Sequence, residues 1–312
     1  MRLLHFLRKM KEMEKEMEIQ VTSNCVHCSL CTEICPAHLF IWSPEGGEDH
    51  EPSDVPVVPH PEACIQCGHC VCLCPADAIL HSAFGPDAKT PISEELKPSW
   101  EQFQQLAATR RSVRSFQSVK VPREQLAQIL QTAETAPTAC NGRHVHWTVV
   151  SDPELLRQIR LATLSVLRKG LAILESPLGF LAAKLFPRSS AGRNYDRIPM
   201  MRSLLKASET QDLILYDAPA LLMAHCSVTG SPFAKGDAQL ALQNAALAAH
   251  ALDLGSFYVG FVTWAAQEDP AIGKLLQLPK DHQIAGGLAV GIPAVQYRFA
   301  PVREFPEVRW LD

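Results

Sequence analysis

The chain has 312 residues, of which 47% are hydrophobic, and a formal net charge of −4 at pH 7. This length predicts about two domains, with enough apolar side chains to form a core in each. The net charge is negative and the sequence has no stripe of basic residues, so a nucleic-acid-binding protein is not expected.

An amphipathic helix is expected at the N-terminus, over residues 1–20. Leu3 and Leu7 lie near one face of it, and Arg8 and Glu12 form an i,i+4 pair on another. The apolar run is too short and too charged for a signal peptide or a membrane span. We expect this helix to dock on its own protein or on a partner subunit, with attachment to a membrane surface as the alternative.

Two cysteine runs follow, CVHCSLCTEICP at residues 25–36 and CIQCGHCVCLCP at residues 64–75. In each run, three cysteines recur at every third position and a fourth stands directly before a proline. This spacing is typical of [4Fe-4S] clusters, because the short gaps bring three thiolates to one cluster while the fourth cysteine reaches the other. The predicted ligand sets are Cys25, Cys28, Cys31 and Cys74 for one cluster, and Cys64, Cys67, Cys70 and Cys35 for the second. Cys72 fits neither set.

Residues 21–82 resemble a bacterial two-cluster ferredoxin, and the first cysteines of the two runs are 39 residues apart (64 − 25). Structural zinc and disulfides are the alternatives. Zinc sites favour two separated C-x2-C pairs, and dense thiols on a chain without a secretion signal indicate a reducing compartment, the cytoplasm. Residues 43–63 are predicted to be an exposed loop without a regular element, and residues 83–99 a linker.

The heptapeptide RRSVRSF, residues 110–116, follows a helix predicted over residues 100–109. Arg110, Arg111, Arg114 and the hydroxyl of Ser112 suit a phosphate held by charge-assisted hydrogen bonds. The alternative is a solvated basic surface near a helix end. A second helix is predicted within residues 121–137, and a long helix of small residues begins near residue 236.

The order of four segments resembles the FMN-dependent nitroreductase family: RRSVRSF, then APTACN, then QNAALAAHALDLGS, and GIP followed by arginines. The resemblance covers roughly residues 105–312, within an expected domain at residues 100–312. It implies an α+β fold with a mixed sheet surrounded by helices, bound FMN, and a homodimer with two FMN sites at its interface. The N-terminal domain adds a two-cluster ferredoxin-like fold.

The resemblance also implies roles for individual residues. Gln243 and Asn244 match the family pattern, although a role in helix capping or in the core is equally open for them. Arg298 competes with Arg303 for the phosphate. The FMN-binding residues implied by the match are Arg110, Arg111, Ser112, Arg114, Pro137, Thr138, Asn141, Tyr258, Val259, Gly260 and Arg303.

Two segments depart from the family pattern. His144 and His146 follow Asn141 where a Gln-Pro-Trp-like run is common, so either imidazole is a candidate to supply a proton to the product, or merely satisfies loop backbone groups. Residues 160–212 predict two amphipathic helices and a polar loop, and the family resemblance implies that this region forms a lid over the flavin. Charged residues break any membrane span there, and Tyr195 and Arg193 are candidates for choosing the substrate.

Clusters carry single electrons and a flavin carries two, so the chain is predicted to be an oxidoreductase that converts between them. A reduced ferredoxin or similar carrier is the expected donor, and a nitroaromatic, quinone or enone the expected acceptor. The G-x-G-x-x-G turn of a nicotinamide-binding Rossmann domain is absent from the sequence. A non-catalytic electron relay or redox-responsive partner and a reductive dehalogenase are the alternatives.

Overall fold

The computed structural model describes residues 17–42 and 55–311. The chain divides into two compact units, the first comprising Met1–Lys97 with Cys140–Gly142, and the second Pro98–Ala139 with Arg143–Asp312. Residues 1–16 of the expected N-terminal helix and residues 43–54 of the expected loop lie outside the described residues. The prediction of a helix to residue 20 is wrong at its end, because strand β1 (Ile19–Val21) begins there and pairs with another strand.

The first unit is built as an internal repeat. Strand β1 pairs antiparallel with β2 (Ile79–His81). Helices α2 (Leu30–Ile34) and α3 (His69–Leu73) each begin inside a cysteine run and are offset by 39 residues (69 − 30). A small apolar core that includes Phe40 and Val71 packs between the two halves.

Short helical turns punctuate the rest of this unit. Within the predicted loop, Val57 forms an antiparallel bridge with Ile41, which precedes the loop, and Pro61–Ala63 forms a 3-10 turn (η1), so the described part is more regular than the proline content suggested. Two further 3-10 turns, η2 (Pro86–Ala88) and η3 (Glu94–Leu96), lie in the predicted linker.

Helix α4 (Trp100–Thr109) confirms the helix predicted over residues 100–109. Its start is specified locally by a capping box. The Ser99 hydroxyl accepts a hydrogen bond from the Gln102 amide, and the Gln102 side chain accepts one from the Ser99 amide.

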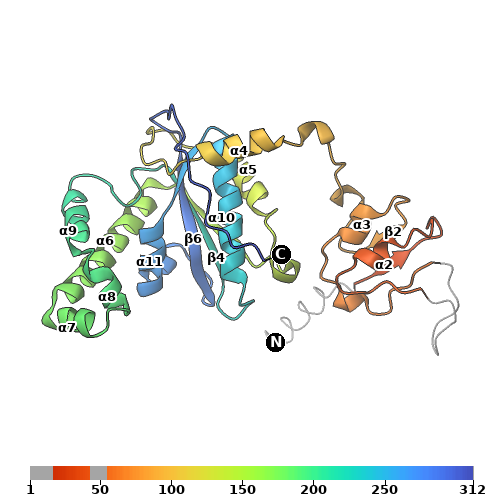
Figure 1. Ribbon diagram of the computed structural model, residues 1–312, viewed down its shortest axis with the longest axis horizontal. Coiled ribbons are helices and arrows are strands. Elements are labelled where there is room, and N and C mark those ends of the chain that lie inside the picture. The colour runs from red at the N-terminus through yellow and green to blue at the C-terminus, as the bar shows by residue number, and fades with distance from the viewer. Residues whose placement is uncertain (1–16, 43–54, 312) are drawn as a thin grey trace, which may run out of the picture. The chain divides into compact units, whose positions relative to one another are not determined.

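A four-stranded sheet forms the centre of the second unit, in the order β3 (His146–Val150), β4 (Ala220–Ser227), β6 (His282–Gly291) and β5 (Gly255–Tyr258) (Figure 1). The pairings between these strands are antiparallel. A parallel bridge between Ser112 and Ser256 adds the arginine segment beside β5, so the mixed character of the sheet comes from this bridge. The fold is α+β, as the sequence predicts.

Helices cover both faces of this sheet. Helices α5 (Arg123–Ala133) and α10 (Ala234–Ala251) pack on one face with the even-numbered residues of β4, such as Leu222. Helices α6 (Pro153–Glu175), α11 (Gly260–Glu268) and α12 (Ala271–Leu275) pack on the other with Leu221. Because both faces are covered, residues 220–226 of β4 are all buried.

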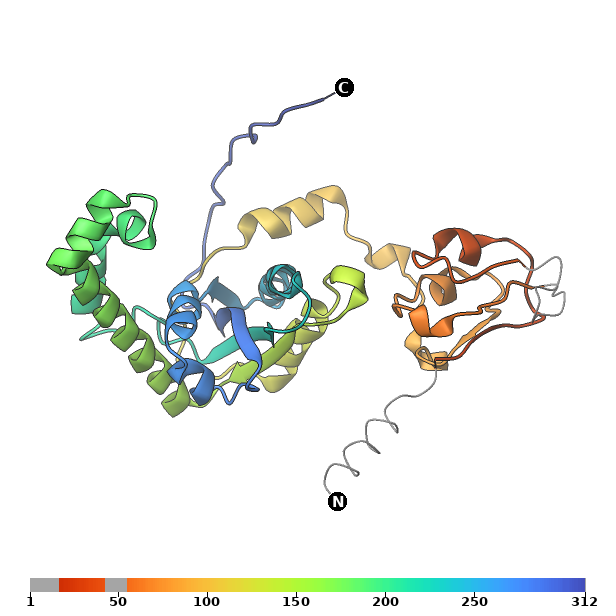
Figure 2. The same cartoon turned by 90° about the horizontal axis from the view of Figure 1, so that it is seen from below.

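The predicted lid contains more helix than expected. Besides α6, it forms α7 (Pro177–Leu185), α8 (Ser190–Tyr195) and α9 (Ile198–Ala207), where the sequence predicts two helices and a loop (Figure 2). Ser176 caps α7 by accepting from the Gly179 amide, and Ser189 caps α8 by accepting from the Gly192 amide. Within residues 17–42 and 55–311, no helix is long and apolar enough to cross a membrane.

Candidate cofactor sites

The first unit gathers eight cysteines around two small cavities. Each cavity is lined by three cysteines of one run and the last cysteine of the other. This grouping arises because each fourth cysteine directly follows a short helix, α2 or α3, and returns toward the opposite half. The sets are Cys25, Cys28, Cys31 and Cys74 around one cavity, and Cys35, Cys64, Cys67 and Cys70 around the other. Cys72 is exposed.

Backbone amides donate to sulfur at matching positions of the two halves. The amides of His27 and Gln66 donate to Cys25 and Cys64 at 3.4 and 3.3 Å. After the fourth cysteine of each run, the amides of Leu39 and Ala78 donate to Cys35 and Cys74 at 3.5 and 3.2 Å. Left-handed backbone recurs at the same offset: His27, Ser29 and His38 in one half, and Gln66, Gly68 and Asp77 in the other.

This chemistry fits two iron–sulfur clusters. Burial raises the pKa of the Cys70 thiol to about 11, and it raises the pKa of Cys31 and Cys64 as well. A metal is the group that keeps such thiols deprotonated, and backbone N–H donors stabilise the sulfur charge. The two groups of four would therefore each hold one cluster.

The second site is organised by residues 110–116. Val113 donates its amide to the Ser256 carbonyl at 3.0 Å, next to the Ser112–Ser256 bridge. On the other side, Gln117 donates to the Ile292 carbonyl at 2.9 Å and Ala294 to the Ser115 carbonyl at 3.0 Å. The segment is thus held between β5 and the chain that leaves β6, which fixes its arginines in place.

A cavity of about 810 Å³ lies beside this segment. Its wall combines the cation of Arg114 with Phe257, Tyr258, Val259 and Gly260 at the end of β5. Gly260 also begins α11, and the first amides of a helix have no partner within the helix, so they are available to a polar ligand. Helices α6, α9 and α11 supply the remaining apolar wall, which includes Leu167, Leu174, Met200, Met201, Phe261 and Trp264.

The guanidinium group of Arg114 at this cavity lies near two aromatic rings. The Arg114 guanidinium lies 5.3 Å from the Phe257 ring centre and 5.8 Å from that of Tyr216. The Tyr258 hydroxyl donates to Oε1 of Gln243 at 3.2 Å. Burial raises the pKa of Tyr258 and nearby Arg110 lowers it, with burial the larger effect, so this phenol stays protonated near neutral pH.

The donor set of this cavity fits FMN. A cation and a helix start suit polar or anionic ligand atoms, and flat aromatic and aliphatic walls suit the flavin ring. Of the residues implied by the family resemblance, the structure brings Arg114, Tyr258, Val259 and Gly260 together in this wall. Arg111 stacks on Tyr297 at 5.7 Å.

Other residues singled out from the sequence lie elsewhere. Thr138 accepts a hydrogen bond from the Arg143 amide at 3.1 Å, and Pro137 lies just before it. Asn141, in the segment grouped with the first unit, donates to the carbonyls of Ile65 and Gln66 at 3.1 and 2.8 Å. Their roles toward FMN, and that of Ser112, stay predictions.

The C-terminal arginines lie outside regular structure. After Ala294, which is still bonded to Ser115, the chain runs as an extended segment away from the strands and helices of its unit (Figure 2). Arg298 contacts the ring of Phe299 at 5.7 Å, and Arg303 is exposed. A contact of either residue with a phosphate stays a prediction.

The catalytic candidates are dispersed. His146 stacks on His225 of the neighbouring strand β4 with ring centres 5.8 Å apart, and the tilted ring of His282, on β6, lies 4.8 Å away. His144 lies in the preceding loop. Tyr195 packs against Phe180, 5.8 Å between ring centres, while Asn194 and Arg197 face the cavity.

Several cavity residues were missed by the sequence reasoning. Arg197 directly precedes α9, Trp264 and Glu268 lie on α11, and none of the three belongs to a local motif. Gly170 was a usable signal, because a Cβ there would lie 3.3 Å from Trp264, and a glycine inside a long helix often marks a close approach. The histidines of β4 and β6 become neighbours of His146 only through strand pairing.

Comparison with known proteins agrees with this geometry. Residues 107–292 match the model of the nitroreductase family, and residues 24–79 that of a 4Fe-4S dicluster domain. An FMN reductase (NAD(P)H) from Bacillus subtilis (strain 168) is 29% identical over 184 residues, which are 59% of this chain. The match spans 63% of that relative's length.

Two further proteins are similar over part of the chain. An iodotyrosine deiodinase from Haliscomenobacter hydrossis is 35% identical over 69 residues, 22% of this chain and 31% of the relative. A crystal structure of a nitroreductase with bound FMN from Desulfitobacterium hafniense DCB-2 has a TM-score of 0.50 and 20% identity, covering 67% of this chain and 97% of that one. This last likeness concerns the fold alone.

Proposed function

The chain belongs to the nitroreductase family, and from this premise we propose that it is an FMN-dependent oxidoreductase supplied with electrons by two [4Fe-4S] clusters. The observation that carries the proposal is the presence of both donor sets on one chain. Eight thiols surround two cavities in the first unit, and Arg114, Tyr258 and Gly260 line a larger cavity in the second. The electron donor is a reduced ferredoxin or a similar one-electron carrier.

FMN, when bound, would supply two-electron chemistry, and the clusters one-electron transfer. The residues of the chain provide binding and exclusion of water. Arg114 offers a cation to the flavin, and the start of α11 offers backbone N–H groups. The apolar side chains of α6, α9 and α11 keep the remaining space dry, which suits a flat and weakly polar acceptor. Nitroaromatics, quinones and enones share these properties.

The acceptor must fit between charges of both signs. Arg197 and Glu268 line the cavity together with the apolar residues of the helices. An acceptor that gains negative charge during reduction is favoured beside an arginine. Tyr258 remains protonated and bonded to Gln243, so it contributes a neutral wall with an aromatic face.

A homodimer would complete this site. The extended segment after Ala294 exposes large apolar side chains, with Phe299 83% and Phe305 81% exposed, and a second copy of the chain would cover them. The thiol-rich first unit fits the reducing cytoplasm. Size-exclusion chromatography with light scattering tests the assembly: a mass of two chains is expected, and a monomer with full FMN content would contradict it.

Anaerobic stopped-flow absorbance tests the activity. The fully reduced protein is mixed in turn with a nitroarene, a quinone, an enone and a halophenol. Rapid two-electron reoxidation of the flavin by one class, with product formed, is expected. If only one-electron carrier proteins reoxidise it, the non-catalytic relay replaces this proposal.

A matched pair of variants tests the electron route. Cys67→Ser should abolish turnover driven by reduced ferredoxin while FMN stays bound, whereas Cys72→Ser should not. Unchanged turnover in the Cys67 variant would contradict the route through the clusters.

Reductive dehalogenation is the second candidate, favoured by the similarity to the iodotyrosine deiodinase over 69 residues. It needs two electrons and a proton per carbon–halogen bond and releases a halide ion. Halide release from the halophenol arm of the same experiment would favour it over nitro, quinone or enone reduction.

A further inference from the structure

His81 breaks the symmetry between the two cysteine cavities. It ends strand β2, is 6% exposed, and lines the cavity of Cys35, Cys64, Cys67 and Cys70. Its Nε2 lies 3.4 Å from Sγ of Cys64. The ring packs edge-on against Phe84, with ring centres 4.9 Å apart.

The tautomer of this ring follows from its other nitrogen. The amide of Ala83 donates to Nδ1 of His81 at 3.1 Å, so Nδ1 must carry a lone pair. The proton of the neutral ring is therefore on Nε2, which makes His81 the donor to the Cys64 sulfur. The strand pairing of His81 with Ile19 and the contact with Phe84 hold the ring in this orientation.

The other cavity has a tryptophan in the corresponding place. The repeat offset of 39 residues relates His81 to Trp42 (81 − 42), and Trp42 lines the cavity of Cys25, Cys28, Cys31 and Cys74. Its ring meets His27 edge-on, with ring centres 5.8 Å apart. Among the described residues, the Trp42 side chain donates no hydrogen bond to any of these four sulfurs, whereas the backbone donors to sulfur are matched in both halves.

We infer that His81 is a positioning residue that raises the reduction potential of the cluster held by Cys64 above that of the other cluster. The inference rests on the proposed function, because it requires both clusters to bind. A hydrogen bond to a ligating sulfur stabilises the more negative, reduced cluster over the oxidised one. The cluster held by Cys64 then accepts an electron first, because its reduction potential is the higher of the two.

Potentiometric titration of the full-length, FMN-loaded protein, followed by electron paramagnetic resonance, tests this inference. Two separate cluster reductions are expected in the native chain. His81→Phe should shift the higher potential to a more negative value and leave the lower one in place. Trp42→Phe is the matched control at the related position and should move neither potential by a comparable amount. A His81→Phe protein with unchanged potentials, or with both shifted equally, would overturn the inference.

If the His81→Phe protein binds less iron than the native protein, two further variants still test the inference. His81→Gln retains an N–H donor near the position of Nε2 and should keep part of the higher potential. Trp42→His places a donor in the other cavity and should raise the lower potential. If His81→Gln keeps none of the higher potential and Trp42→His leaves the lower potential unchanged, the inference is wrong. Iron and sulfide content of the native protein distinguishes this failure from that of the proposed function, which requires two clusters.

Discussion

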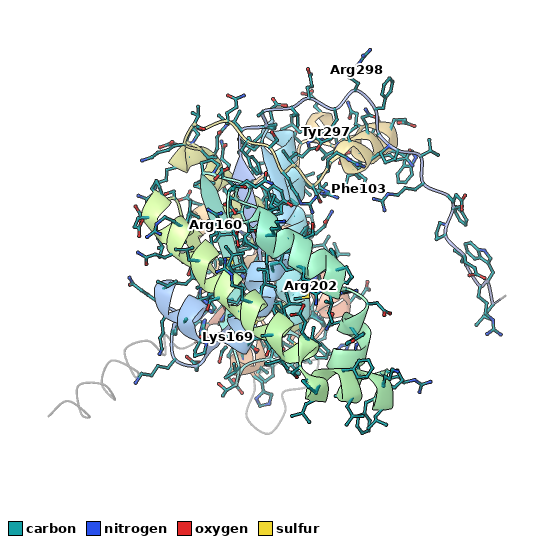
Figure 3. All side chains as sticks on the ribbon, turned by 90° about the vertical axis from the view of Figure 1, so that its left-hand side faces the viewer. Phe103, Arg160, Lys169, Arg202, Tyr297 and Arg298 are labelled. Carbon is teal, nitrogen blue, oxygen red and sulfur yellow. The ribbon has the colours of Figure 1, made fainter. Side chains whose placement is uncertain are left out.

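Nε of Arg160, in the first half of α6 (Figure 3), lies 3.3 Å from Oδ1 of Asp212, in the turn after α9. Asp212 is 8% exposed and also accepts hydrogen bonds from the amides of Ile214 and Leu215, each at 2.9 Å. Arg160 donates in addition to the carbonyls of Ser208 and Gln211. The turn held by this network continues into Tyr216, in the cavity wall, so the pair supports the site as well as the fold.

Removing the carboxylate of Asp212 should therefore destabilise the second unit. Asp212→Ala removes the counter-ion of Arg160 and the acceptor of three backbone amides, those of Ile214, Leu215 and Asp217, which costs about 3 kcal/mol. Urea unfolding followed by circular dichroism measures this change. Glu154→Gln is the control, because its pair with Arg157 is exposed and screened by solvent, so its loss should change stability much less. Equal effects of the two variants would contradict the importance of the network.

Arg114 should carry a measurable share of FMN affinity. Arg114→Met removes the cation beside Phe257 and keeps an apolar chain of similar length. The loss of a charge-assisted contact should weaken binding about tenfold to hundredfold, as measured by quenching of FMN fluorescence. Arg123→Met, at the exposed start of α5, should leave the affinity unchanged. An unaffected Arg114 variant would place the flavin elsewhere.

Gly255 should be required for the position of the arginine segment. A Cβ at Gly255 would lie 2.8 Å from Cβ of Val113, too close for an unshifted backbone. Gly255→Ala is expected to reduce both stability and FMN affinity, because Val113 is tied to the next residue of β5 by its amide. Val113→Ala combined with Gly255→Ala should recover only a small part of the affinity, since it removes the two γ-methyl groups at 2.8 and 3.0 Å but keeps the Cβ of residue 113. Gly236→Ala, where an added Cβ meets nothing within 4 Å, is the control.

The histidine cluster should make the second unit sensitive to acid. Burial first, and then the neighbours His282 and His146, lower the pKa of His225 from 6.5 to about 4. Nδ1 of His225 lies 2.8 Å from Nδ1 of His282, and its Nε2 lies 3.2 Å from Oγ1 of Thr148, so the ring nitrogens of His225 face a histidine and a hydroxyl rather than a carboxylate. Asp281 is the nearby acid, and its pKa is lowered chiefly by the Ser227 hydroxyl.

The sign follows from proton binding in the two states. Between about pH 4 and about pH 6.5, His225 is protonated in the unfolded chain but not in the folded protein. The free energy of unfolding therefore has its full value above about pH 6.5 and decreases as the pH falls toward about 4. The loss should be on the order of 2 kcal/mol for His225. His225→Gln should flatten the profile of unfolding free energy between these values, whereas His144→Gln should not. A native profile that is already flat there would refute the role of the cluster.

The crossed ligand sets can be tested through the fourth cysteines. Cys74→Ser should disturb the cluster of Cys25, Cys28 and Cys31, although Cys74 belongs to the other run. Iron content should fall by roughly half, and the remaining cluster should keep the potential that depends on His81. Cys72→Ser, two residues away and exposed, should keep full iron content. Loss of the Cys64 cluster instead would show that each run binds its own cluster.

The sequence alone determined what depends on local spacing. The cysteine repeat at a 39-residue offset indicated both groups of thiols, and a helix was predicted over the residues that form α4. The run of small residues likewise indicated the long helix α10. Each of these features depends on residues that lie within a few turns of one another or in a repeat, so it can be recognised without any tertiary contact.

Tertiary structure decided what depends on pairing between distant segments. Helices α7 and α8 of the lid begin at serine caps, which the sequence alone does not distinguish from other polar residues of a loop. Arg197, Trp264 and Glu268 reach one cavity only when α6, α9 and α11 pack together. The donor from His81 to Cys64 joins residues 17 positions apart through the return of β2 along β1. Spacing indicates which residues can bind a cofactor, but the surroundings that tune them come from packing.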